Sequence, residues 1–120
     1  MTATTLFAVA AAFNLVCTGT HVQTKNGSVV PDAPFSHTYR VDLNNSRYCL
    51  ATCEQTHPIF QTTDTKIIFT RLEQDSILIE VSVSRESGFY NAISNSPSGS
   101  GWSQGTCTKA PFTGFPARKF

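Results

Sequence analysis

The stretch KIIFTRLEQDSILIEVSVSR, residues 66–85, decides the fold class, because its apolar side chains alternate with the period of a β-strand. Every odd-numbered residue from 77 to 83 is Ile or Val, and most of the positions between them carry a charge or a hydroxyl group. Such alternation places one set of side chains on each face of an extended chain. Gln74 and Asp75 divide the stretch into two apolar runs, so it predicts an antiparallel hairpin with a tight turn.

The same alternation recurs on both sides of this hairpin, and no segment has the helical period of about 3.6 residues. Strands are expected over residues 13–22, 36–43, 47–53, 66–73, 76–85, 89–94 and 102–109. Turns are expected at residues 44–46 and 85–88, and longer loops at 25–34 and 95–101, where Asn, Gly, Pro and Ser gather. The predicted fold is all-β, an antiparallel meander of about seven short strands forming a strongly curved sheet or small open barrel. A two-layer β-sandwich is the alternative.

Length and charge limit the classes of partner. A chain of 120 residues is enough for one domain and too short for two ordinary ones. Nine basic and eight acidic side chains leave a net charge of +1, so neither nucleic acid nor an anionic membrane surface is a favoured partner. The sequence has no apolar run long enough for a transmembrane helix, and no motif that indicates a cofactor.

The N-terminus has some features of an export signal. An apolar run covers residues 6–13, and the small residues 10–12 would suit signal-peptidase cleavage before Phe13, although the first basic residue is Lys25. Residues 1–12 are therefore interpreted as a weak signal segment or an extension of the first strand, followed by a single all-β domain over residues 13–120. A periplasmic or secreted location is expected, with the cytoplasm as the alternative.

Four cysteines agree with a disulfide framework in an oxidising compartment. We favour Cys49 with Cys53 across a local turn, and Cys17 with Cys107 between the first and last strands; the alternative is four free thiols. The stretch RYCLATCEQTH also permits a metal site made of Cys49, Cys53 and His57. An extended backbone would hold the first two sulfur atoms about 13 Å apart, which is too far for one ion.

Several segments resemble a group of small uncharacterised bacterial proteins that often carry an export signal. These segments are FNLVCTGT (residues 13–20), TYRVDL (38–43), RYC (47–49), GTC (105–107) and PFTGFP (111–116). The resemblance extends over nearly the whole chain from Phe13 to Phe120. It implies a bacterial, exported protein and carries no activity.

Aromatic residues are concentrated in the last part of the sequence. They are Phe89, Tyr90, Trp102, Phe112 and Phe115. In an open barrel they could line the mouth and hold an apolar or planar ligand; otherwise they form the core itself. An edge strand of the meander could also pair with a second chain, as in any open sheet.

No nucleophile motif is present, so the leading hypothesis is a non-enzymatic binding or structural module of the cell envelope. One alternative is the metal-binding protein described above. The second is a small hydrolase or isomerase with a histidine in the barrel mouth. For that reaction the chain offers His21, His37 and His57, with Asp32, Asp42 or Asp64 to orient the ring.

Overall fold

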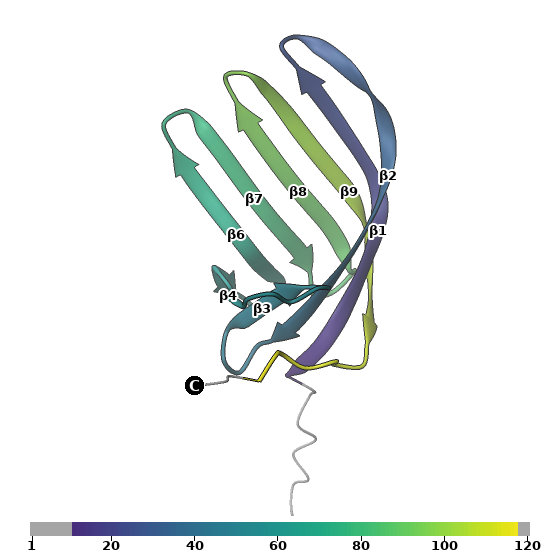
Figure 1. The fold of residues 1–120 in the computed structure, drawn as a ribbon, viewed down its shortest axis with the longest axis vertical. Coiled ribbons are helices and arrows are strands. Elements are labelled where there is room, and N and C mark those ends of the chain that lie inside the picture. The colour runs from purple at the N-terminus through teal and green to yellow at the C-terminus, as the bar shows by residue number, and fades with distance from the viewer. Residues whose placement is uncertain (1–10, 118–120) are drawn as a thin grey trace, which may run out of the picture.

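The computed structural model describes residues 11–117, and in this range the chain forms one antiparallel sheet with no helix. Its nine strands are β1 (Ala12–Lys25), β2 (Ser28–Asp42), β3 (Arg47–Leu50), β4 (His57–Pro58), β5 (Gln61–Thr62), β6 (Lys66–Gln74), β7 (Ile77–Ser84), β8 (Phe89–Ser96) and β9 (Gly99–Ala110). They lie in the order β4-β3-β2-β1-β9-β8-β7-β6-β5, curled into a half-barrel (Figure 1). The predicted all-β curved sheet is confirmed. The two strands beyond the expected seven, β4 and β5, have two residues each, too few to produce a periodic pattern.

Both predicted long loops are wrong, because hairpins occupy these segments. The chain turns at Asn26 and Gly27, whose φ angles are 50° and 81°, and β2 begins at the next residue. Asn-Gly is the preferred pair for such a tight turn. At residues 95–101, β8 continues to Ser96 and β9 starts at Gly99, and β9 pairs along its length with β1. Pairing with neighbouring strands therefore overrides the loop-like composition.

Pro34 fits into β2 because it faces a free edge of the sheet. The α-carbons of the opposed residues Cys17 and Cys107 lie 3.9 Å apart. So close an approach indicates a non-hydrogen-bonded antiparallel pair, in which the two backbone amides point away from each other. The amide of Cys17 therefore points to β2, where His37 lies opposite. Three residues before His37, the nitrogen of Pro34 therefore points away from β1. That side of β2 has no partner strand at this position, because β3 pairs with β2 only from Tyr39 onward. Proline is tolerated at such an edge position.

The curl of the sheet depends on a pair of glycines. Gly19 of β1 and Gly105 of β9 lie directly opposite each other, and a Cβ on either would lie 1.9 Å from a backbone oxygen of the other strand. Phe35 lies beside the first glycine on β2, and Tyr90 lies beside the second on β8. Their ring centroids are 5.4 Å apart although two strands separate them. The aromatic rings thus fill the space that the glycines leave, an arrangement known to stabilise curved sheets.

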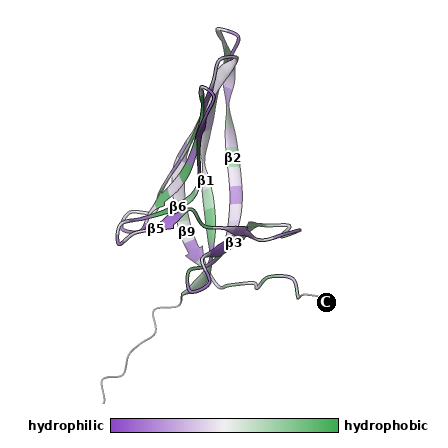
Figure 2. Ribbon diagram, turned by 90° about the vertical axis from the view of Figure 1, so that its left-hand side faces the viewer, coloured by the Kyte–Doolittle hydropathy of each residue, from purple (hydrophilic) through white to green (hydrophobic). Residues whose placement is uncertain are grey.

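The hydrophobic core lies on the concave face. Tyr39 stacks on Phe69, with centroids 4.5 Å apart and planes at 10°. Around them lie further buried apolar residues: Leu15, Cys17, Val41, Ile59, Ile67, Val83, Tyr90 and Cys107. Seen from the side, the sheet is narrow at the hairpin tips and its strands spread apart toward the end that carries β3 and β5 (Figure 2). That curled end is called the base below.

Both favoured disulfides are present. Cys17–Cys107 joins β1 to β9 across 90 residues of sequence, and Cys49–Cys53 closes a local turn. The strand expected over residues 47–53 stops at Leu50, whose carbonyl accepts a hydrogen bond of 2.7 Å from the amide of Cys53. Cys53 has a φ of 45°, so the backbone turns here and brings the two α-carbons to 5.1 Å.

The N-terminal prediction falls mostly outside the described residues. Of residues 1–12, the structure describes Ala11 and Ala12; Ala12 begins β1, and the carbonyl of Ala11 accepts a hydrogen bond from the amide of Leu43. Among residues 11–117 there is no helix with the length and apolar character needed to span a membrane.

Candidate ligand-binding groove

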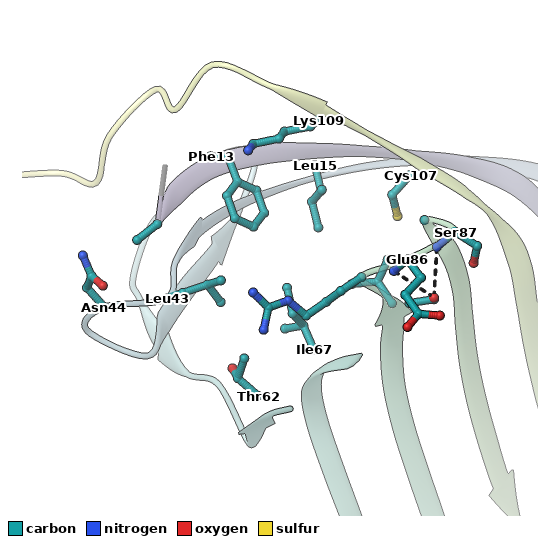
Figure 3. A pocket seen from close by; sticks show the side chains of 15 residues that line it. Phe13, Leu15, Leu43, Asn44, Thr62, Ile67, Glu86, Ser87, Cys107 and Lys109 are labelled. Carbon is teal, nitrogen blue, oxygen red and sulfur yellow. Dashed lines mark hydrogen bonds between the residues drawn. The ribbon is translucent and has the colours of Figure 1, made fainter. Parts of the chain in front are cut away.

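A groove of about 630 Å³ opens on the concave face at the base of the sheet. Its apolar side chains come from strands far apart in sequence. They are Phe13 and Leu15 of β1, Leu43 just after β2, Ile67 of β6 and Val83 of β7. In Figure 3, those of Phe13, Leu15, Leu43 and Ile67 point into the same space. The period-2 alternation explains this, because each strand turns its apolar side toward the inside of the curl.

One end of the groove is formed by the turn between β7 and β8, which the sequence predicted at residues 85–88. The hydroxyl of Ser84 accepts hydrogen bonds from the amides of Glu86 and Ser87, and Gly88 has a φ of 76°. Both features hold the turn in one conformation. The guanidinium of Arg85 donates to the carbonyl of Thr63 over 2.7 Å, which fixes this cation at the rim.

A second cation, Lys109, lies on the opposite wall. It follows Cys107 by two residues on β9, so both side chains are on the groove side of the strand. Its amine lies 5.1 Å from the centroid of the Phe13 ring, a cation–π distance (Figure 3). Glu86 is the acidic residue that lines the same groove.

A second groove, of about 590 Å³, lies beneath the C-terminal tail and is more polar. Arg47 lines it, but its guanidinium already donates to the hydroxyl and carbonyl of Thr56. Phe115 of the tail lies at its side. The tail itself is fixed to the sheet by Asn14, whose side chain bonds Thr113, and by Arg40, which donates to the carbonyl of Gly114. This groove offers a ligand less apolar surface than the first one.

The five aromatic residues predicted to line a shared mouth lie on three different surfaces. Tyr90 is buried in the concave core, whereas Phe89 and Trp102 are on the convex face and are 45% and 49% exposed. Phe112 and Phe115 contact each other edge to face in the tail, with centroids 5.2 Å apart. The reason is again alternation, since neighbouring residues such as 89 and 90 must point to opposite faces.

The metal-site alternative requires two thiolates that this structure holds as a disulfide. Both sulfur atoms of Cys49 and Cys53 are bonded to each other, and the ring of His57 packs against Tyr48 at 5.5 Å. In the described part of the chain, no group of three or more His, Cys, Asp or Glu side chains is placed to hold a metal ion.

Of the three histidines proposed for catalysis, His21 has a hydroxyl partner. Its Nδ1 lies 2.7 Å from the Oγ of Ser103 on the concave side of the sheet. His37 is exposed, and its ring lies beside that of Phe35. Within residues 11–117 no histidine forms an ion pair with a carboxylate, and neither His21 nor Ser103 lines the two grooves.

Two buried tyrosines lie deeper on the concave face. The hydroxyls of Tyr39 and Tyr90 are hydrogen-bonded at 2.7 Å. Burial raises the pKa of both residues above the ordinary value, and the neighbouring Tyr90 raises that of Tyr39 further. Both hydroxyls therefore stay protonated at neutral pH, and the pair serves as a polar link within the core.

Sequence reasoning missed the groove, because its cations lie on different elements. Arg85 was part of a predicted turn, and Lys109 belonged to the last predicted strand. One signal was available. Lys109 lies two residues after Cys107, so both side chains are on the same face of the strand, and the predicted disulfide places Cys107 on an inner face. No family model, curated protein or solved structure matches this chain. The groove is therefore interpreted from its own chemistry.

Proposed function

We propose that this protein is a small exported β domain of the bacterial cell envelope that binds a ligand without catalysing a reaction. The observation that carries the proposal is the concave groove of about 630 Å³ with its apolar lining. Sites for small molecules are typically concave, largely apolar and of about 300–1,000 Å³, with a few polar groups that orient the ligand. The base groove has each of these properties.

Export is supported by the cysteine chemistry. Disulfides persist in the periplasm and outside the cell, and are rare in the cytosol, where thiols are kept reduced. All four cysteines are paired in the structure. The resemblance to small exported bacterial proteins points the same way.

Location can be tested by expressing the full sequence in a bacterial host and fractionating the cells. The expected result is a periplasmic or secreted protein whose intact mass, measured with and without reductant, corresponds to two disulfides and to removal of an N-terminal segment. A cytoplasmic protein with four thiols open to alkylation would contradict the export proposal.

Binding can be tested with the neutral apolar probe phenylnaphthylamine, whose fluorescence rises when it leaves water. We expect saturable binding that Leu43→Trp weakens by about tenfold or more, because the larger side chain fills the groove. The matched control is Leu72→Trp on β6, which adds the same ring outside the groove. Equal binding by both variants, or absence of saturable binding, would refute the groove as a ligand site.

The contact between His21 and Ser103 supports a second candidate, a small hydrolase. Its 2.7 Å separation suits proton transfer from a serine nucleophile to a histidine base. Ser103 is buried, however, and His21 has no carboxylate to orient it among the described residues. Non-enzymatic binding is therefore favoured. Turnover of small aryl esters that Ser103→Ala abolishes, in a variant that keeps the wild-type melting temperature, would reverse that preference.

A further inference from the structure

The base groove combines an apolar floor with two cations that lack an anionic partner. Arg85 and Lys109 are on its walls, and neither has a carboxylate within ion-pairing distance among the residues that the structure describes. The ion pairs among the described residues belong to Arg71, which binds Glu73 and Glu80 on the hairpin of β6 and β7, outside the groove. The groove cations thus differ from Arg71 in having charge available for a ligand.

Arg85 is held so that most of its donors remain free. One nitrogen donates to the carbonyl of Thr63, and the turn behind it is fixed by the hydroxyl of Ser84. A guanidinium carries five N–H donors in a planar fork that matches a carboxylate. A preorganised cation of this kind loses little conformational entropy when an anion binds.

Lys109 places its charge over the apolar part of the groove. Its amine lies above the Phe13 ring, and Leu15 is beside it on the facing strand (Figure 3). The two cations outnumber Glu86, the acidic lining residue, so the groove keeps a net positive charge. An anion at the rim would therefore be attracted while an apolar chain lies on the floor.

We propose that the groove binds a single-chain amphiphile with a carboxylate head group, the chemistry of a long-chain fatty acid. The alkyl chain lies on Phe13, Leu43 and Ile67, where each buried methylene leaves water and so favours binding. The carboxylate lies between Arg85 and Lys109, where charge-assisted hydrogen bonds replace its hydration. This inference rests on the proposed binding function and adds the class of ligand.

The test compares dodecanoate with dodecanol, which has the same chain and no charge, by displacement of phenylnaphthylamine from the full-length protein. We expect wild type to bind dodecanoate about tenfold or more tightly than dodecanol. Added salt should weaken the binding of dodecanoate alone, because screening acts on the charged head group. Arg85→Gln and Lys109→Gln should each lower the preference for dodecanoate over dodecanol by about tenfold, the effect of losing about 1.4 kcal/mol.

Lys25→Gln is the matched control, since it removes the same charge at a hairpin tip far from the groove. Saturable dodecanol binding by each variant shows that the groove is still folded. If the rim variants bind dodecanoate as tightly as Lys25→Gln does, the head-group inference is wrong while the apolar binding function stands. If wild type binds neither amphiphile nor the probe, both proposals fail.

Discussion

The two disulfides should contribute unequally to stability, because the contribution of each rises with the logarithm of the length of chain that it closes. Cys17–Cys107 spans 90 residues and Cys49–Cys53 spans 4. In the chain-entropy model, the long loop corresponds to about 4.6 kcal/mol of stabilisation and the short one to about 2 kcal/mol. The difference of about 2.5 kcal/mol arises in the unfolded state, where the long loop restricts many more conformations.

The chain provides its own control for the loss of packing. All four cysteines are buried, so the double variants Cys17→Ala/Cys107→Ala and Cys49→Ala/Cys53→Ala each remove two buried sulfur atoms. The cost of the resulting cavities is similar in the two variants and largely cancels in the comparison. What remains is the effect of loop length.

Urea unfolding followed by the fluorescence of Trp102 measures both variants under the same conditions. The variant that lacks the Cys17–Cys107 disulfide should have a free energy of unfolding about 2.5 kcal/mol below that of the variant that lacks Cys49–Cys53. Equal losses, or a larger loss from the local pair, would refute the loop-entropy reasoning. Such a result would mean that Cys49–Cys53 acts mainly through the folded structure, by holding the turn after β3.

Two further predictions concern the concave face. Gly105→Ala should destabilise the protein by about 3 kcal/mol or more, because the new Cβ would lie 1.9 Å from a backbone oxygen. Gly101→Ala on the same strand should cost less than about 1 kcal/mol, since its nearest neighbour is a histidine ring carbon 3.4 Å away; thermal melts of both variants check this. Tyr39→Phe should cost about 1 kcal/mol at neutral pH by removing the hydrogen bond to Tyr90. Because burial raises the folded-state pKa of Tyr39, the unfolded chain loses this proton first, so wild-type stability falls as the pH rises above about 10. In a series of urea melts the variant should have a shallower alkaline decline, and equal slopes would contradict the assignment.

The hairpin of residues 66–85 could be predicted from sequence because its signal is local. Alternating Ile and Val residues define β7, and the apolar run of Ile67, Ile68 and Phe69 defines β6. The error is one residue at the turn, which lies at Asp75 and Ser76. The Cys17–Cys107 disulfide was predicted between the first and last strands, and the Cys49–Cys53 disulfide across a local turn. These features need only short-range pattern and connectivity.

The segments that failed needed information from other strands. Residues 25–34 and 95–101 are rich in Pro, Gly and Ser, and such residues usually mark loops. Here the parts of β2 and β9 in these segments pair with β1, so their partners determine their structure. The groove is non-local in the same way, because Arg85 and Lys109 share it only once the sheet has curled.

The glycine pair lies on the same two strands as one wall of the groove. Gly19 and Gly105 allow β1 and β9 to approach closely, and the disulfide two residues away joins the same strands. Cys107 of that disulfide lines the groove, so the proposed ligand site lies beside the most constrained part of the sheet. A site on paired and covalently joined strands keeps its shape before a ligand arrives, which lowers the entropic cost of binding. The hairpin tips lack such constraints, and their free edges carry Pro34 and the charges of β6, features that oppose pairing with another chain. These constraints favour the base over the tips as the proposed binding site.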